Sequence, residues 1–157
     1  MNETRSAIND LLLKTFCDIL NIEESVLKQG VFNDLTISEM HTIEAIGLHG
    51  RRTMSQAARE LSVTVGTLTV AVSSLVRKSY AERFRVEEDR RFVKVGLSSK
   101  GRLAFRAHEK FHADMIGHMV NGLTEEEERI LASSLGKLNG FLQDFQKHVS
   151  DKAGGGA

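Results

Sequence analysis

The side chains with the clearest chemical capacity are cations that gather on one short stretch. Five of them stand within twelve residues: Arg83, Arg85, Arg90, Arg91 and Lys94. Guanidinium and ammonium groups at this density bind the phosphate oxygens of nucleic acids, and arginine also enters narrow minor grooves. A solvated charged surface is the simpler alternative for such a stretch.

Small hydroxyl side chains form a second group directly before the cations. They are Thr64, Thr67, Thr69 and Ser73, and Arg77 follows them. Short hydroxyl residues let a helix approach DNA closely, hydrogen-bond to bases or phosphates, and place threonine methyl groups against thymine methyl groups. Taken alone, the pattern fits a Ser/Thr-rich surface helix equally well.

The elements that would position these groups are two short helices and a hairpin. Thr53-Met-Ser-Gln56 is a capping box that opens a helix over 54–61, 62–64 is a turn, and Thr64 can cap a second helix to about Lys78. This is a helix-turn-helix pattern, in which the second helix presents its first residues to base edges. Apolar residues that alternate on each side of a charged turn predict a β-hairpin over 82–97. An arginine-rich hairpin beside a reading helix is typical of a wing.

Charge is distributed unevenly, although the formal net charge of the 157-residue chain is zero. Residues 51–110 hold 14 Lys/Arg and 6 Asp/Glu, which gives a surplus of +8. The remainder holds 7 Lys/Arg (21 − 14) and 15 Asp/Glu (21 − 6), which gives −8. The cationic segment coincides with the two helices and the hairpin, as expected of a surface that binds nucleic acid.

Three segments in this region resemble the MarR family of winged helix-turn-helix repressors. They are Arg77-Lys-Ser-Tyr-Ala-Glu-Arg83, Asp89-Arg-Arg91 and Val95-Gly-Leu-Ser-Ser-Lys-Gly101. The resemblance implies that the wing arginines contact DNA, with Arg91 at the tip and Asp89 holding an arginine in place. The family usually has glycine where this chain has Ser79. Because glycine suits a left-handed helix C-terminus, Ser79 indicates a different or slightly strained exit from the second helix.

The rest of the chain is mostly helical, so the expected fold class is mainly α with a small β-hairpin wing. Apolar stripes and capping boxes predict helices over about 6–28, 36–48, 98–121 and 124–149. We expect 35–98 to form the winged helix-turn-helix, 1–34 and 99–150 to form a helical dimerisation region, and 151–157 to be a disordered tail.

The apolar stripes of the terminal helices predict a homodimer. A winged helix needs only about three helices and a hairpin to close its core, and exposed stripes of this length are costly in water. A two-fold dimer would bury them. It would also set two reading helices roughly 34–36 Å apart on a palindromic double-stranded DNA operator.

Four further side chains could ligate a metal ion. His108 and His112 are four residues apart on one predicted helix face, the spacing at which two imidazoles share a metal. His41 and either Glu23 or Glu24 could complete a tetrahedral zinc site, and this set resembles that of zinc-responsive MarR repressors. The alternative is that histidines between helices hydrogen-bond to carboxylates, as His41 could to Glu23.

A different effector follows from a further resemblance, to the fatty-acid-biosynthesis repressors of the same family. It rests on 35–43, 63–69 and 102–112, and it includes the histidines, which therefore do not decide between the two effectors. The resemblance implies a long-chain acyl group on acyl carrier protein as co-repressor. Flexible and aromatic side chains suit an apolar tunnel for that chain, and plain core packing is the alternative for each of them. The candidate ligand-binding residues are Phe16, Met40, His41, Phe105, His108, Phe111, His112 and Met115.

Composition argues against several other classes of protein. No 18-residue apolar run indicates a membrane span, and no charged and apolar leader indicates secretion. The single cysteine, Cys17, fits a reducing cytoplasmic compartment, and we expect it to be a small buried residue rather than a peroxide sensor. The chain has no glycine-rich phosphate loop or nucleophile elbow, so we expect neither an enzyme nor a catalytic cofactor.

Overall fold

The computed structural model describes residues 2–85 and 93–154. Contacts within the chain divide it into two compact units, Met1–Lys110 and Phe111–Ala157. The predicted division by function, with 35–98 set apart from 1–34 and 99–150, stays a prediction.

Helices make up most of the first unit. They are α1 (Glu3–Gln29), α2 (Ile37–Ile46), α3 (Met54–Glu60), α4 (Val65–Arg77) and the first part of α5 (Ser99–Val120). Both predicted capping boxes are present at helix starts, Thr36 with Glu39 and Thr53 with Gln56. Each box satisfies two backbone N–H groups that the first helical turn leaves without a partner, which is why these helices begin where the sequence predicts.

Three short antiparallel strands form one sheet in the order β1-β3-β2. They are β1 (Arg52–Thr53), β2 (Ala81–Arg85) and β3 (Val93–Leu97). Arg83 and Arg52 both lie opposite Val95, on its two sides. The predicted hairpin of β2 and β3 is confirmed, but the sequence does not predict β1, because two residues are too few to show an alternating pattern.

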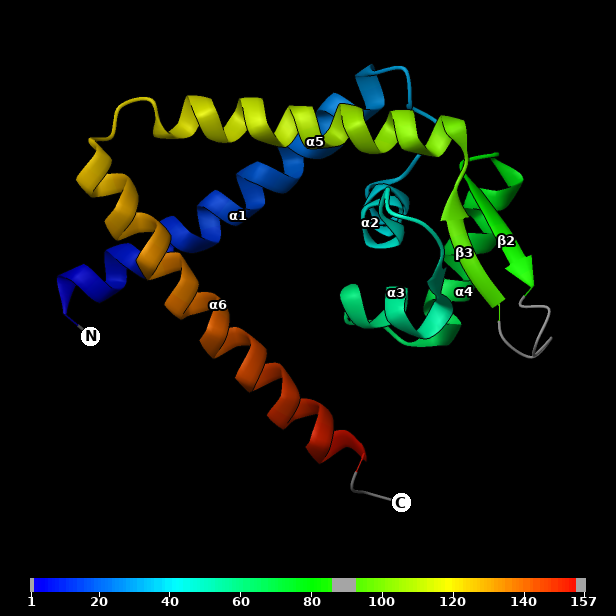
Figure 1. The fold of residues 1–157 in the computed structure, drawn as a ribbon. Coiled ribbons are helices and arrows are strands. Elements are labelled where there is room, and N and C mark those ends of the chain that lie inside the picture. The colour runs from blue at the N-terminus through cyan, green and yellow to red at the C-terminus, as the bar shows by residue number, and fades with distance from the viewer. Residues whose placement is uncertain (1, 86–92, 155–157) are drawn as a thin grey trace. The chain divides into compact units, whose positions relative to one another are not determined.

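The core of the first unit lies between α2, α3, α4 and the sheet, which are grouped together in Figure 1. Burying one large aliphatic side chain completely adds about 1.5–3 kcal/mol to the free energy of unfolding. The start of α5 packs closely on this core, since a Cβ at Gly101 would lie only 2.0 Å from the carbonyl oxygen of Tyr80. Fully buried side chains include Ile43, Leu68, Val72, Leu75, Tyr80 and Val95.

The second unit contains the end of α5 and helix α6 (Glu125–Gly154). Thr124 and Glu127 form the third predicted capping box, with the Glu127 backbone N–H donating to the Thr124 hydroxyl at 3.3 Å. The helix continues four residues into the stretch 151–157, where the sequence predicts a disordered tail. The residues Asp151-Lys-Ala153 contain no helix breaker, which allows the extension. Among the described residues, no helix is long and apolar enough to cross a membrane.

Large apolar side chains stay exposed on α1 and α6 of the single chain. Leu11 on α1 is 64% exposed and Phe141 on α6 is 65% exposed. Cys17 on α1 is exposed too, so the prediction that it is buried is wrong for the single chain. The cause is that α1 buries only its last turns, at Glu23 and Leu27.

Candidate nucleic-acid interface

The helix-turn-helix forms as the sequence predicts. Thr64 is the N-cap of α4, and its hydroxyl oxygen accepts the backbone N–H of Thr67 at 3.1 Å. The turn before it contains Ser62, whose φ of +55° lies in the left-handed region. Helices α3 and α4 pack against each other and against α2, which determines the face that α4 turns outward.

Helix α4 has one buried face and one exposed face. Leu68, Val72 and Leu75 are buried, at the helical spacing that the sequence predicts. Val70 lies near the centre of the opposite face and is 73% exposed, one turn from Ser73. Sequence reasoning missed Val70 as a candidate DNA contact, because a valine in an amphipathic pattern counts toward the core.

Hydroxyl groups on the exposed face of α4 already make intramolecular hydrogen bonds. Thr69 donates to the Val65 carbonyl and Ser73 donates to the Thr69 carbonyl, each at 2.7 Å. The hydroxyl oxygens of Thr64 and Thr67 are 2.9 Å apart. Thr69 and Ser73 have therefore used their single hydroxyl protons, and toward DNA in this conformation they can act only as acceptors.

Arg83 reaches from β2 onto α4. Its Nη2 donates to the Ser73 hydroxyl at 2.6 Å and lies 3.4 Å from the Thr69 carbonyl oxygen. Ser73 thus holds a guanidinium group beside the reading helix, a role that the sequence does not indicate. Guanidinium carries five N–H donors, so Arg83 keeps others to offer to a phosphate or a base.

The strands carry two more of the predicted DNA contacts. Arg85 on β2 is exposed, and Lys94 on β3 is half-buried opposite Phe84. Arg51 places its guanidinium carbon 3.5 Å from the centre of the Phe84 ring, a cation–π contact that the sequence analysis did not foresee. The predicted wing-tip residues Asp89, Arg90 and Arg91 lie outside the described residues, and their roles stay predictions.

The sequence left two alternatives for the exit from α4, a different exit or a slightly strained one, and the structure has the strained one. Ser79 has a φ of +66°. Its backbone N–H bonds to the Val76 carbonyl at 3.0 Å, and the Tyr80 N–H bonds to the Leu75 carbonyl at 2.8 Å. This pair of bonds is a Schellman motif, which glycine usually completes. Ser79 therefore holds a conformation that is strained for a residue with a Cβ.

Tyr80 anchors this exit to the loop before α2. Its hydroxyl donates to Asp34 at 2.6 Å, and the Lys100 Nζ lies 3.9 Å from the centre of its ring. Burial and the bond to Asp34 raise the pKa of the Tyr80 hydroxyl. The same bond holds the pKa of Asp34 below its usual value. Both effects follow from one hydrogen bond that favours neutral tyrosine and ionised aspartate.

Glu39 connects α2 to the last turn of α4. Its carboxylate accepts the Ser74 hydroxyl at 2.6 Å and the Lys78 ammonium at 2.7 Å. Burial acts to raise the pKa of Glu39, but these bonds hold it below its ordinary value. The sequence identifies Glu39 only as part of a capping box, because its partners Ser74 on α4 and Lys78 at the C-cap lie 35 and 39 residues away and no local pattern links them.

The histidine and carboxylate set partly comes together. Glu23 Oε1 lies 3.2 Å from His41 Nε2 and 2.9 Å from His108 Nε2. Glu23 and His108 are buried, whereas Glu24 is exposed and pairs with Lys28 at 2.7 Å. The hydrogen bond from His41 to Glu23, which the sequence offered as the alternative to metal binding, is therefore present. Glu44 also lies near His108, with Oε1 at 3.6 Å from Nε2.

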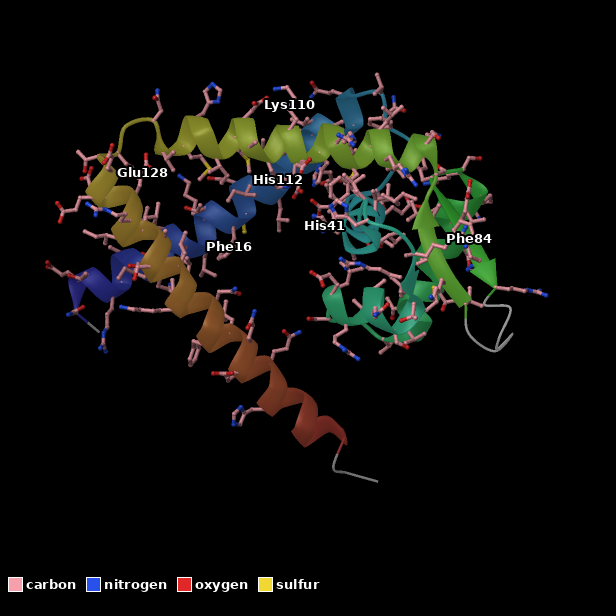
Figure 2. The ribbon with its side chains drawn as sticks, in the orientation of Figure 1. Phe16, His41, Phe84, Lys110, His112 and Glu128 are labelled. Carbon is pink, nitrogen blue, oxygen red and sulfur yellow. The ribbon has the colours of Figure 1, made fainter. Side chains whose placement is uncertain are left out.

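The predicted apolar ligand residues differ in their exposure within the unit to which each belongs, and their role as ligand contacts stays a prediction. Met40 is fully buried in the core, and Phe105 packs against that core while partly exposed. Phe16 and His41, labelled in Figure 2, lie on different helices, and Phe16 is exposed on α1. Phe111, His112 and Met115 are half-buried residues of the second unit. For Met40, plain core packing is what the structure shows.

Comparisons with known proteins agree with a helix-turn-helix beside a small antiparallel sheet. The MarR family model matches residues 33–91, which include α2, α3, α4 and β2. The fold is similar to that of Streptococcus pneumoniae FabT in complex with DNA, with 42% sequence identity, a TM-score of 0.86, and coverage of 90% of this chain and 99% of that chain.

Relatives in Bacillus subtilis (strain 168) are regulators as well. The HTH-type transcriptional repressor MdtR is 24% identical over 132 residues, covering 84% of this chain and 83% of MdtR. The HTH-type regulator YwhA, itself uncharacterised, is 30% identical over 90 residues, covering 57% of this chain and 65% of YwhA. The chain belongs to the MarR family and is a DNA-binding transcriptional regulator, not an enzyme.

Proposed function

We propose that the protein is a dimeric repressor that reads a palindromic operator with two copies of α4. The observation that carries the proposal is the 42% identity, over 90% of the chain, to FabT in complex with DNA. The contacts of Arg83 support it, because they hold a cation next to the exposed face of α4. With its distance from α4 constrained, Arg83 can bind a phosphate at the edge of the groove that α4 enters. A protein with this function acts in the cytoplasm.

Exposed apolar side chains support the dimer. Leu11 and Phe16 on α1, and Phe141 and Phe145 on α6, are each more than half exposed in the single chain. Exposed apolar surface of this kind marks association sites in soluble proteins. A two-fold axis pairs each such face with its own copy and places the two α4 helices on successive turns of one groove.

Site selection from random duplexes, combined with light scattering, tests this function. We expect a dimer and an enriched inverted repeat whose half-sites are separated by about one helical turn. Phe141→Ser should shift the chain toward monomer and reduce operator affinity. Val31→Ser, an equally polar change at an exposed residue outside both helices, is the control and should do neither. A monomer that binds a single half-site with full affinity would contradict the proposal.

We further propose that a long-chain acyl group carried by acyl carrier protein is the co-repressor. Support comes from the resemblance of 35–43, 63–69 and 102–112 to fatty-acid-biosynthesis repressors, together with the identity to FabT. Phe105 is the best placed of the apolar candidates, since it borders the core without being enclosed by it. An acyl chain bound there would contact α5 close to the point where α5 packs on the core of the first unit.

Operator binding in the presence of defined effectors tests the co-repressor. The arms are long-chain acyl-carrier protein, the unacylated carrier protein, Zn²⁺ and no addition. We expect a gain in affinity only with the acylated carrier. Phe105→Ala should lose that gain, whereas Leu103→Ala, an exposed neighbour on the same helix, should keep it. Equal affinities with the acylated and unacylated carrier would refute this effector.

Zinc is a second candidate effector because of one observation. The ligand atoms of Glu23, His41 and His108 all lie within 4.8 Å of one another, as a shared metal ion requires. Metal content of purified wild type and His108→Ala decides this case. Stoichiometric zinc in the wild type alone, with operator binding lost on chelation, would favour zinc. Metal-free protein that still responds to the acylated carrier would exclude it.

A further inference from the structure

The C-terminal end of α4 is tied to α2 by directional polar bonds. The buried carboxylate of Glu39 accepts the Lys78 ammonium on both oxygens, at 2.7 and 3.0 Å, and the Ser74 hydroxyl at 2.6 Å. Ser74 in turn accepts Arg77 Nη2 at 3.1 Å. One carboxylate therefore organises three residues in the last turn and C-cap of the reading helix.

The loop before α2 adds a second set of bonds to the same end. Lys78 also donates to the backbone carbonyl of Asp34, and Tyr80 donates to the Asp34 carboxylate at 2.6 Å. Lys100, from the start of α5, reaches Asp34 Oδ2 at 3.5 Å and the Lys78 carbonyl at 3.2 Å. The end of α4 is thus bound on the side of α2 and on the side of α5.

These polar bonds restrict rotations and shifts of α4 that apolar packing alone would allow. The buried face of α4 consists of Leu68, Val72 and Leu75, and apolar packing is non-directional, so it tolerates small rotations and shifts of a helix. A carboxylate that accepts three hydrogen bonds has strict distance and angle requirements. Base reading is sensitive to such shifts, because hydrogen bonds and methyl contacts in the groove weaken within a fraction of an ångström.

We propose that Glu39 is a positioning residue for DNA reading: its carboxylate sets the rotation and axial position of α4 through Ser74 and Lys78. The assignment rests on the proposed role of α4 as the reading helix. This role requires no contact between Glu39 and DNA. Its second function, closing the capping box of α2 by accepting the Thr36 N–H at 2.8 Å, holds the carboxylate in place on its own helix.

The sign of the effect on DNA affinity separates positioning from plain electrostatics. A carboxylate near a phosphate-binding surface repels DNA, so removing its charge should by itself strengthen binding. Loss of a positioning group has the opposite effect, and only on the sequence that α4 must read. Glu39→Gln is the suitable change, because an amide oxygen in the place of Oε2 still accepts the Thr36 N–H. The ion pair with Lys78 is lost, and an NH2 donor faces the Ser74 hydroxyl that a carboxylate oxygen accepted.

The experiment compares Glu39→Gln with Glu82→Gln on selected operator and on random-sequence DNA. Glu82 is an exposed acid on β2, so its variant makes the same charge change near the same surface. We expect Glu39→Gln to lower operator affinity roughly tenfold, the factor that corresponds to one charged hydrogen bond. Its affinity for random DNA should stay equal or rise. Glu82→Gln should show equal or higher affinity for both DNAs.

Ser74→Ala provides a second variant that alters no charge. It breaks the same contact from the α4 side, so it should also lower operator affinity and should not add fully to Glu39→Gln in the double variant. Operator affinity that is unchanged or raised in both single variants would overturn the proposal. If Val70→Ala also left operator affinity and preference unchanged, the reading role of α4 would fall first. If Val70→Ala lowered them, only the role of Glu39 would fall.

Discussion

Replacing Ser79 by glycine should stabilise the protein by about 0.5–1 kcal/mol. The φ of +66° at Ser79 costs a residue with a Cβ about 1–2 kcal/mol, because the Cβ crowds the following carbonyl. Glycine removes this cost. It also makes the unfolded chain more flexible, which lowers the free energy of unfolding by about 0.4–1 kcal/mol. The Schellman bonds and the bond from the Ser98 hydroxyl to the Ser79 carbonyl use only the backbone of residue 79, so they are kept.

Urea and thermal unfolding at one fixed protein concentration measure this change. A gain of 1 kcal/mol corresponds to a rise in Tm of about 2–4 °C for a protein of this size. Ser55→Gly is the matched control, since Ser55 is an exposed residue of α3 and does not have a positive φ. That variant should lose about 0.5 kcal/mol through helix propensity alone. If Ser79→Gly were destabilised as much as Ser55→Gly, the account of a strained exit would be wrong.

Three other predictions concern DNA binding and acid stability. Val70→Ala should reduce the preference for thymine at one position of each half-site, and replacing that thymine by deoxyuridine should cause no further loss; additive losses at every thymine would contradict a methyl contact. Arg83→Ala should weaken operator binding and reduce the slope of log affinity against log salt by about 0.9 for one lost phosphate contact. An unchanged slope would mean that Arg83 bonds to Ser73 on α4 but contacts no phosphate. The pKa of Glu39 is below its ordinary 4.5, so its stabilisation is complete above that pH and is lost as the pH falls through the folded value. Glu39→Gln should therefore lose less stability than the wild type between about pH 6 and pH 3 in urea titrations, and an identical loss would contradict the shift.

The sequence predicts those parts of the fold that depend on neighbouring residues. The boxes at Thr36, Thr53 and Thr124 all appear at helix starts, because each joins residues only three positions apart. The strand β1 escapes prediction for the opposite reason: its two residues are defined by pairing with β3, about 40 positions away. The strained exit at Ser79 was one of two alternatives, and only a family pattern that has glycine there pointed to it.

The candidate site also combines features that the sequence predicts with features that it does not predict. Residue types on α4 identify the exposed face, but they do not show that the hydroxyls of Thr69 and Ser73 have already donated their protons to the helix. Nor do they show that Ser73 accepts Arg83, or that Glu39 reaches across to Lys78. These are long-range contacts between polar side chains, and periodicity carries no information about them.

The surplus of +8 over residues 51–110 overstates the charge that DNA meets. Among the described residues, Lys78 forms an ion pair with Glu39 and Lys100 forms one with Asp34, and both acids lie outside the segment. Subtracting these two pairs from +8 leaves at most +6. The salt slope counts the phosphates that individual Lys and Arg side chains neutralise, at about 0.9 each, so Lys78 and Lys100 should add nothing to it while their ion pairs hold. Titration of operator affinity between about 50 and 200 mM salt measures it. A slope that falls by about 0.9 in Lys78→Gln would mean that Lys78 leaves Glu39 to bind phosphate, which is incompatible with Glu39 holding α4 in the complex.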